Sequence, residues 1–429
     1  MAILRAGHLA RSSTVNYGST LLLTHDNSLV NYLRFMADGA ISDVRIETYA
    51  KFARGYLASR GRMRDNCILT ETQAVVSRAL DAARIDEPSA DGFFARPVEF
   101  FQDELEWIAG NGLSTKEDYL AAQRFGRKEA LQPSQRAAMW VLRNKYLEAM
   151  ASIGKMYDWA NLASAVRLAL GEDGTTRRYR HIIVDEAQDF SPEVLRSLSE
   201  AIQPGGSLTL FLDESQQIYG QRTSWKSVGL RVSKIESFNE NYRNSAEIAA
   251  VALAMVDMPH FRDIPDIVPP SGTSRAAGSK PTLFIASDEA AELREVRARI
   301  IALGRTGSVA VLGRTRAEAR RMVSGISGSQ LISRDMPPWT SRPGVYYGTY
   351  FSAKGLEFEV VVLPFADAAK LPLPSIVAAF GRDEAMARES RQLYVGVTRA
   401  RTELLVSCSG VLTALLPDMD SDVWTVVRA

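Results

Sequence analysis

Residues 181–189, with the sequence HIIVDEAQD, constrain the fold of this chain more than any other stretch. Residues 182–184 form an apolar run that predicts a short buried strand, and acids follow it at Asp185, Glu186 and Asp189. A parallel strand that ends in carboxylates places them where open α/β sheets bind ligands. There the first carboxylate can hold a hydrated Mg²⁺, and the second can polarise a water for attack on a phosphate. An isolated acidic turn after a core strand is more often a solvated surface feature, so the rest of the chain must decide.

The composition is that of an ordinary globular protein: of 429 residues, 46% are hydrophobic and 24% are charged. This length allows two or three domains. The formal net charge is only +1, so a site for a polyanion must be a local patch. The cysteines, Cys67 and Cys408, and four scattered histidines give neither a disulfide framework nor a Cys/His metal site. Neither a membrane-length apolar run nor a signal peptide is apparent, which predicts a cytoplasmic protein.

Apolar runs that indicate strands alternate with helical patterns along the first part of the chain. These runs lie at residues 20–24, 45–48, 181–185 and 207–213. Residues 66–155 interrupt the alternation with aromatic-rich helical patterns. We therefore predict a first β/α lobe over residues 1–258, with a helical insert at about residues 55–155.

Residues 259–281 differ from their surroundings because prolines and glycines accumulate there, which predicts a linker. Beyond it the β/α alternation restarts, with strand-like runs at residues 282–286, 308–312, 345–350, 359–364 and 403–407. We predict a second β/α lobe over residues 282–429. The predicted fold class is therefore α/β, with two lobes built on parallel sheets and a helical insert in the first.

Two further stretches of the first lobe combine a strand end with polar side chains. Residues 211–219, FLDESQQIY, place Gln216 at a strand tip, where a glutamine can orient an attacking water and sense a terminal phosphate. Residues 241–245, NYRNS, place Arg243 at the edge of the lobe. An ordinary polar strand end and a surface ion pair explain these residues equally well when each is taken alone.

Two stretches of the second lobe have the same character. Residues 349–358, TYFSAKGLEF, form a loop in which Glu357 could bond a ribose hydroxyl. Residues 392–401, QLYVGVTRAR, present Arg399 and Arg401 near the end of a helix. Arginines from a second lobe can stabilise the charge on a transferring γ-phosphate. Each arginine alone is more often part of a surface ion pair.

In their order along the chain, DEAQD, NYR, SAKGLEF and YVGVTRAR closely resemble the motifs of UvrD/Rep-type superfamily 1 helicases. The resemblance runs from residue 2 to about residue 410. It implies two RecA-like lobes of the P-loop NTPase type, with ATP and Mg²⁺ between them and single-stranded DNA across their tops. The activity it implies is ATP-driven helicase or translocase action, generally 3′ to 5′. The motifs do not distinguish DNA from RNA.

The resemblance also implies roles for individual residues. Asp185 would coordinate Mg²⁺, Glu186 would be the general base for water, and Glu357 would bind the ribose of ATP. Gln216 would couple the state of the γ-phosphate to DNA, and Arg243 and Arg399 would contact that phosphate. The residues that would bind the nucleic-acid strand are Thr24, Ser28 and Thr48 in the first lobe, and Thr349 and Ser352 in the second.

Two features depart from the family on its DNA-binding side. The family usually has an aromatic residue where this chain has Gln221, followed by Arg222. Base stacking contributes about 1–3 kcal/mol per base, so the grip would be weaker or would shift to Tyr219 or Trp225. Simple packing explains Trp225 equally well. The large insert that many members carry in the second lobe is absent, so translocation or ATP-gated binding is better supported than robust unwinding.

The Gly-rich phosphate-binding loop of such ATPases is missing, because no GxxxxGK[ST] occurs in the sequence. Residues 272–280, GTSRAAGSK, are a poor imitation, because Ser279 separates the second glycine from the lysine and Pro281 follows. Residues 1–10 instead resemble the helix that follows this loop in the family. We therefore expect little ATP hydrolysis from residues 1–429 alone.

Three explanations for the missing loop remain open. The start of the chain is truncated, a partner chain supplies the loop, or this is a degenerate member that binds nucleic acid or acts as a scaffold without hydrolysis. We favour truncation, because loss of a normally central strand would leave unpaired strand edges inside the first lobe.

Overall fold

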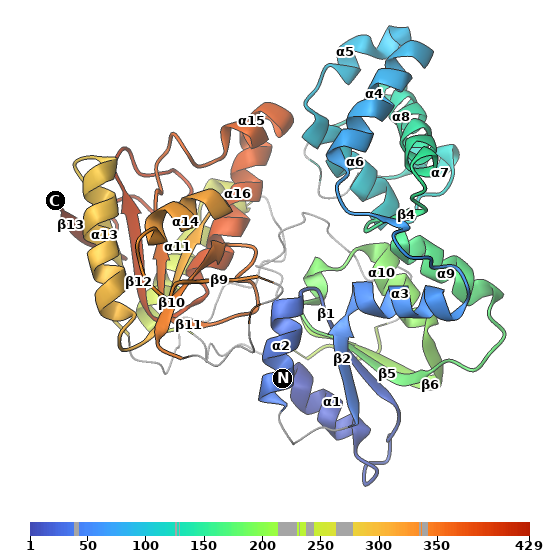
Figure 1. The fold of residues 1–429 in the computed structure, drawn as a ribbon, viewed down its shortest axis with the longest axis horizontal. Helices are drawn as coiled ribbons and strands as arrows, with labels where there is room; N and C mark the ends of the chain where they lie inside the picture. Colours follow the sequence, from blue (N-terminus) through green and yellow to red (C-terminus); the bar gives the residue numbers. More distant parts are fainter. Residues whose placement is uncertain are drawn as a thin grey trace.

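The computed structural model of the protein describes residues 1–37, 43–124, 127, 129–212, 230, 232–236, 244–262, 278–333, 336 and 342–429. Within these ranges the chain forms two large parallel sheets and a separate helical cluster (Figure 1). The α/β fold with parallel sheets that the sequence predicts is thus confirmed. None of the helices in the described ranges is both long and apolar enough to cross a bilayer.

The first sheet has the strand order β2-β1-β5-β6, with all neighbours parallel. Its strands are β1 (Thr20–Thr24), β2 (Val44–Thr48), β5 (Tyr179–Val184) and β6 (Ile202–Leu210). Every residue of β1 is buried because helices cover both faces of the sheet. Leu22 packs with α1 (Ala2–Ala10) and α2 (Asn27–Met36). Leu21 and Leu23 pack on the other face, with α3 (Tyr49–Ser59), α9 (Leu162–Glu172) and α10 (Pro192–Glu200).

The helical cluster, here called the insert, stands between β3 (Ile68–Leu69) and β4 (Tyr157–Asp158), which pair with each other. Its α-helices are α4 (Gln73–Asp86), α5 (Asp91–Phe94), α6 (Val98–Gly110), α7 (Lys116–Ala121) and α8 (Pro133–Ser152). Aromatic side chains such as Phe101 and Trp107 form a core of its own. The sequence placed the start of the insert near residue 55, but α3 packs on the first sheet, and the core of the insert begins at Leu69.

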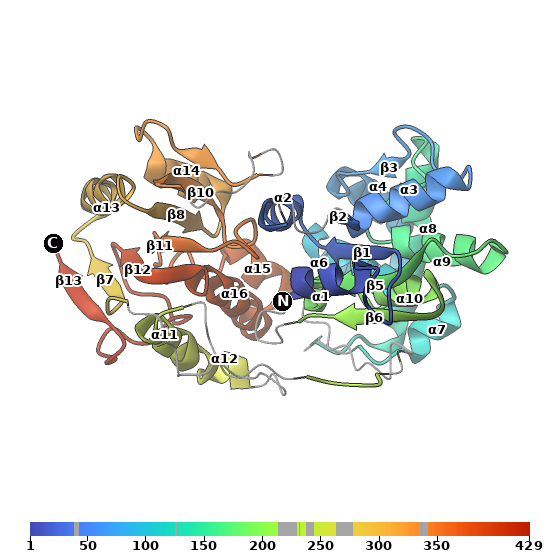
Figure 2. The same cartoon turned by 90° about the horizontal axis from the view of Figure 1, so that it is seen from below.

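The second sheet has the strand order β13-β7-β12-β11-β8-β10-β9 and is also parallel (Figure 2). Its strands are β7 (Thr282–Ile285), β8 (Ser308–Gly313), β9 (Gln330–Leu331), β10 (Gly344–Thr349), β11 (Phe358–Leu363), β12 (Ala400–Cys408) and β13 (Thr425–Arg428). On one face lie α13 (Glu289–Leu303) and α14 (Arg316–Val323). On the other lie α11 (Ala246–Val256), α12 (Pro259–Arg262) and α16 (Arg382–Val397), and α15 (Pro374–Phe380) precedes α16.

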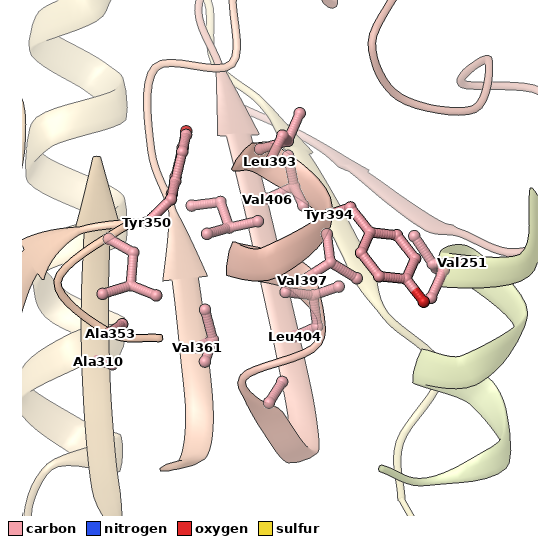
Figure 3. Packing of buried hydrophobic residues seen from close by; sticks show 14 of the residues in the cluster. Val251, Ala310, Tyr350, Ala353, Val361, Leu393, Tyr394, Val397, Leu404 and Val406 are labelled. Carbon is pink, nitrogen blue, oxygen red and sulfur yellow. The ribbon is translucent and has the colours of Figure 1, made fainter. Parts of the chain in front are cut away.

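Helix α11 belongs to the second sheet, although the sequence analysis assigned residues up to 258 to the first lobe. Val251 of α11 is fully buried beside Tyr394 of α16 in the core of the second sheet (Figure 3). The N–H of Ser245, the N-cap of α11, also donates to the carbonyl of Arg401 at 2.9 Å. The expected boundary at residue 258 thus differs from the packing of α11, which lies with the second sheet.

Candidate functional site

The acids of the first sheet stand at the C-terminal end of β5. The N–H of Asp185 still donates to the carbonyl of Leu23 at 2.8 Å, so the parallel pairing extends to this residue. Glu186 then adopts a left-handed conformation, with φ 54° and ψ 46°. A non-glycine residue in that region costs about 1–3 kcal/mol, and such strain concentrates at functional sites. The side-chain amide of Gln188 donates to Oε2 of Glu186 at 2.5 Å, which fixes the carboxylate.

Two threonines predicted to bind nucleic acid end neighbouring strands. Thr24 of β1 and Thr48 of β2 are register partners, so their side chains lie at the same edge of the sheet. The hydroxyl of Thr48 accepts the N–H of Lys51 at 3.3 Å and caps α3. Thr24 is fully buried, and within the described residues its hydroxyl has no hydrogen-bond partner. Ser28 lies in α2, but its side chain is outside the described part of the structure.

The loop after β10 carries the corresponding residues of the second lobe. Thr349 and Ser352 bond to each other: Oγ of Ser352 accepts the N–H of Thr349 at 2.9 Å, and Oγ1 of Thr349 accepts the N–H of Ser352 at 3.1 Å. These hydroxyls therefore fix the bend of the loop. Glu357, at the end of the loop, is half-buried.

Beyond that bend the loop reaches the first lobe. Nζ of Lys354 donates to Oδ1 of Asp189 at 2.5 Å, and both side chains are buried. Burial raises the pKa of Asp189 above its ordinary value, although the charge of Lys354 acts in the opposite direction. This ion pair connects the turn that contains Glu186 to the loop that contains Ser352.

A small pocket lies where the two loops meet. Its lining residues are Thr24, His25, Asp26, Leu29, Glu186, Asp189, Phe351 and Lys354. The ring of His25 lies 6.0 Å from the ring of Phe190 in the first lobe and 6.0 Å from that of Phe351 in the second. The pocket has room for about one water molecule. It is lined by the segment from the end of β1 to the start of α2, by the turn after β5, and by the loop after β10 of the second lobe.

Gly355 provides a test of how closely the lobes meet. It has φ +76°, and a Cβ on it would lie 2.8 Å from Cδ2 of Leu29 in α2. Gly355→Ala should therefore destabilise the protein by about 1–3 kcal/mol more than Gly325→Ala, as judged by urea denaturation. Gly325 is the matched control, because its φ is +84° but a Cβ on it would meet no other atom within 4 Å. Equal losses in the two variants would mean that backbone strain alone accounts for the effect.

Arg399 occupies the junction between α16 and β12. It is fully buried, and its guanidinium donates to the carbonyl of Val395 at 3.1 Å and to Oγ1 of Thr398 at 3.1 Å. Asn244 holds the same junction from the other side, because its amide donates to the carbonyls of Thr398 at 3.0 Å and Ala400 at 2.5 Å. Asn244, which directly follows Arg243 in the chain, thus donates hydrogen bonds to the residues on either side of Arg399.

The structure unites some of the predicted site residues and leaves others undescribed. Thr24 and Glu186 share the pocket between the lobes, and Asp185 precedes Glu186 in the chain. Gln216, Tyr219, Arg222 and Arg243 lie outside the described residues. Sequence reasoning missed the contacts of Lys354 and Asn244. Their places inside recognised motifs indicated that both residues could be functional. The sequence did not indicate their partners, which are far away in the chain.

Comparisons with known proteins are consistent with these motifs. The UvrD/REP helicase N-terminal domain family matches residues 67–236, and the UvrD-like helicase C-terminal domain family matches residues 341–410. A structural comparison pairs the chain with the C-terminal domain of a possible DNA helicase from Lactobacillus plantarum WCFS1. That match has a TM-score of 0.30 and 20% identity, and covers 43% of this chain and 98% of the other.

Curated relatives include the ATP-dependent DNA helicase UvrD2 of Mycobacterium tuberculosis (strain H37Rv) and that of Mycobacterium bovis. Each is 28% identical over 267 residues, which covers 59% of this chain. The chain spans 37% of the length of these relatives. The two domain families together match more than half of the chain, in the order in which the motifs occur. The chain therefore belongs to the UvrD/Rep-type helicases.

Proposed function

We propose that this chain is the motor part of an ATP-dependent DNA helicase or translocase that acts on single-stranded or partly duplex DNA, in the 3′ to 5′ direction. One observation carries the proposal: the Glu186 turn of the first lobe and the Lys354 loop of the second meet through a buried ion pair. A motor needs its hydrolytic group and its strand-gripping loops to respond to each other. A direct bond between the two loops provides such a connection.

The donor set at the end of β5 fits Mg²⁺ bound together with ATP. Mg²⁺ is usually held by one or two carboxylates, with substrate phosphates and water as its other ligands. No group of three or more His, Cys, Asp or Glu side chains that could hold a metal occurs among the described residues. Asp185 would hold the ion, which would supply charge neutralisation at the phosphates when it is bound.

The chain's own residues would then divide the remaining work. Glu186, oriented by Gln188, would accept a proton from the attacking water. Arg399 and Arg243 would stabilise charge at the terminal phosphate, Gln216 would sense that phosphate, and Glu357 would hold the ribose. For the domain organisation, we propose a first lobe that ends before residue 244 and a second lobe that includes α11.

The strand-binding roles of Thr24, Ser28, Thr48, Thr349 and Ser352 stay proposals of the same kind. Thr24 is the strongest of them, because a fully buried hydroxyl without a described partner is costly unless something binds it. Tyr219 would add stacking on a base of the strand, and Arg222 would add a positive charge beside the strand.

A second candidate function is nucleic-acid binding or scaffolding without hydrolysis. The buried guanidinium of Arg399 favours it, because this side chain already bonds to groups of its own lobe. ATP hydrolysis that depends on single-stranded DNA, measured in a version of the protein that carries a Gly-rich phosphate loop, separates the two candidates. Its presence there supports the motor, and its absence with DNA binding intact supports the scaffold.

Binding of labelled oligothymidylate, followed by fluorescence anisotropy, tests the DNA-binding part that both candidates share. If about five phosphates are contacted, the affinity should fall by about 100-fold between about 50 and 200 mM salt, because released counterions oppose binding. A blunt duplex of the same length is the control for strand preference. An affinity that does not change with salt would contradict a groove that tracks phosphates.

A further inference from the structure

The insert contacts the second lobe directly. Asp103 of α6 accepts two hydrogen bonds from Arg388 of α16, from Nη1 at 3.0 Å and from Nη2 at 3.1 Å. This two-pronged geometry is the strong form of an arginine–carboxylate pair. Arg127 of the insert also pairs with Asp103. Figure 1 shows α15, which leads into α16, directed at the insert.

Aromatic rings complete this contact. The guanidinium of Arg388 lies 3.9 Å from the ring centroid of Phe380, at the end of α15. Phe380 in turn lies 6.4 Å from Phe100 of α6 and packs against the core of the insert. Nε of Arg388 donates to Glu384 at 2.7 Å. The side chain of Arg388 is therefore fixed by two carboxylates and a ring, unlike a mobile surface pair.

The other end of α6 rests on the first lobe. Nη1 of Arg196 in α10 donates to the carbonyl of Asn111 at 2.8 Å, in the turn that follows α6. In the same turn, a Cβ on Gly112 would collide with the carboxylate of Glu193, so the backbone lies directly against α10. Helix α10 begins just after the turn that contains Glu186.

Helix α16 connects the Arg388 contact to Arg399. Eleven residues separate them, which corresponds to about 16 Å along a helix. Nε of Arg399 donates to the carbonyl of Val395 in the last turn of α16, so the two move together. The insert thus spans from the helix that follows Glu186 to the helix that precedes Arg399.

We infer that the insert is a brace that sets the orientation of the two lobes, with Asp103 and Arg388 as positioning residues for Glu186 and Arg399. The lobes already meet at Lys354 and Asp189. One contact alone leaves a hinge about which the lobes can rotate, whereas a second contact at a distance fixes their orientation. That the insert fixes the orientation of the lobes follows from the contacts alone. Only its consequence for Glu186 and Arg399 rests on the proposed function.

Single-molecule energy transfer between the lobes tests the brace. Dyes are placed by Val15→Cys in the first lobe and Val411→Cys in the second, both exposed positions, while the native cysteines are buried. The protein that carries only the two dye-labelled cysteine substitutions should give one narrow distribution of energy-transfer efficiencies. Arg388→Ala should broaden or split it, and Arg388→Lys should have an intermediate effect, because lysine keeps the charge but loses the fork and the ring stacking.

Two further comparisons separate positioning from folding. The double variant Asp103→Asn/Arg388→Ala should broaden the distribution no more than the more disruptive of the two single variants, because both substitutions remove the same contact. Arg294→Ala, which removes an exposed pair with Glu295 elsewhere in the second lobe, should leave it unchanged. The unfolding midpoint of each variant is measured in parallel, and the distributions are recorded well below it.

The result that overturns the brace is an unchanged distribution in Arg388→Ala at a temperature where the protein is folded. Oligothymidylate affinity is then measured in the same variants, and a loss of about 3- to 30-fold in Arg388→Ala is expected if lobe orientation shapes the strand-binding groove. An unchanged affinity would reject that link to the site. The energy-transfer measurement needs neither ATP nor DNA, so a failure of the proposed function and a failure of the brace are distinguishable.

Discussion

Replacing Arg399 by alanine should lower the rate of ATP hydrolysis by about 10³-fold or more, in a version of the protein that carries a Gly-rich phosphate loop. The reason is that an arginine from the second lobe stabilises charge that develops at the terminal phosphate only in the transition state. Binding of ATP should change by much less, because a lost transition-state interaction lowers the turnover number more than the affinity. Steady-state turnover and binding of a fluorescent ATP analogue measure the two effects.

Because Arg399 is buried, its replacement should also lower the stability of the fold, and the experiment must separate this loss from the loss of turnover. Alanine would leave the carbonyl of Val395 without this donor and open a cavity, which should cost about 2–4 kcal/mol of stability. Glu186→Gln is the comparison variant, because it should abolish turnover with no such loss of packing. Equal losses of turnover and ATP binding in folded Arg399→Ala would contradict a transition-state role.

The strands were predictable from the sequence, whereas the assignment of α11 to a sheet was not. Short apolar runs that end in acids or polar residues gave β1 and β5 nearly to the residue. Helix α11, AEIAAVALAMV, is apolar on most sides, so its pattern shows that it is buried without showing against which sheet. The linker predicted at residues 259–281 assigned it to the first lobe. The bonds of Asn244 and the packing of Val251 place it in the second.

The contacts between the lobes had no signal in the sequence at all. Lys354 stands 165 residues from Asp189, and Arg388 stands 285 residues from Asp103. Periodicity and capping patterns reach only a few residues along the chain, so neither pair could be deduced from them. The local motifs therefore identify the halves of the candidate site, and tertiary packing decides how those halves meet.

Replacing Lys354 by methionine should destabilise the contact between the lobes by about 3–5 kcal/mol at neutral pH, because the buried carboxylate of Asp189 loses its partner. The Val15 and Val411 dye positions report this contact during urea titration. Asp189→Asn combined with Lys354→Met is the matched control. Removing both charges together should recover most of the loss, since buried pairs replaced as a unit are often nearly neutral.

The loss in Lys354→Met should also depend on pH. The pKa of Asp189 is already raised by burial. Loss of Lys354 removes the largest effect that opposes this rise and leaves the charge of His25 as the remaining one, so the pKa of Asp189 should rise further. A carboxyl with a raised folded-state pKa contributes stability that is present below its unfolded pKa of about 3.9 and is lost as the pH rises through the folded value. The deficit of Lys354→Met should therefore be largest near neutral pH and shrink toward pH values of about 4. A deficit that stays constant over this range would show that Lys354 acts through packing, and that charge on Asp189 does not hold the lobes together.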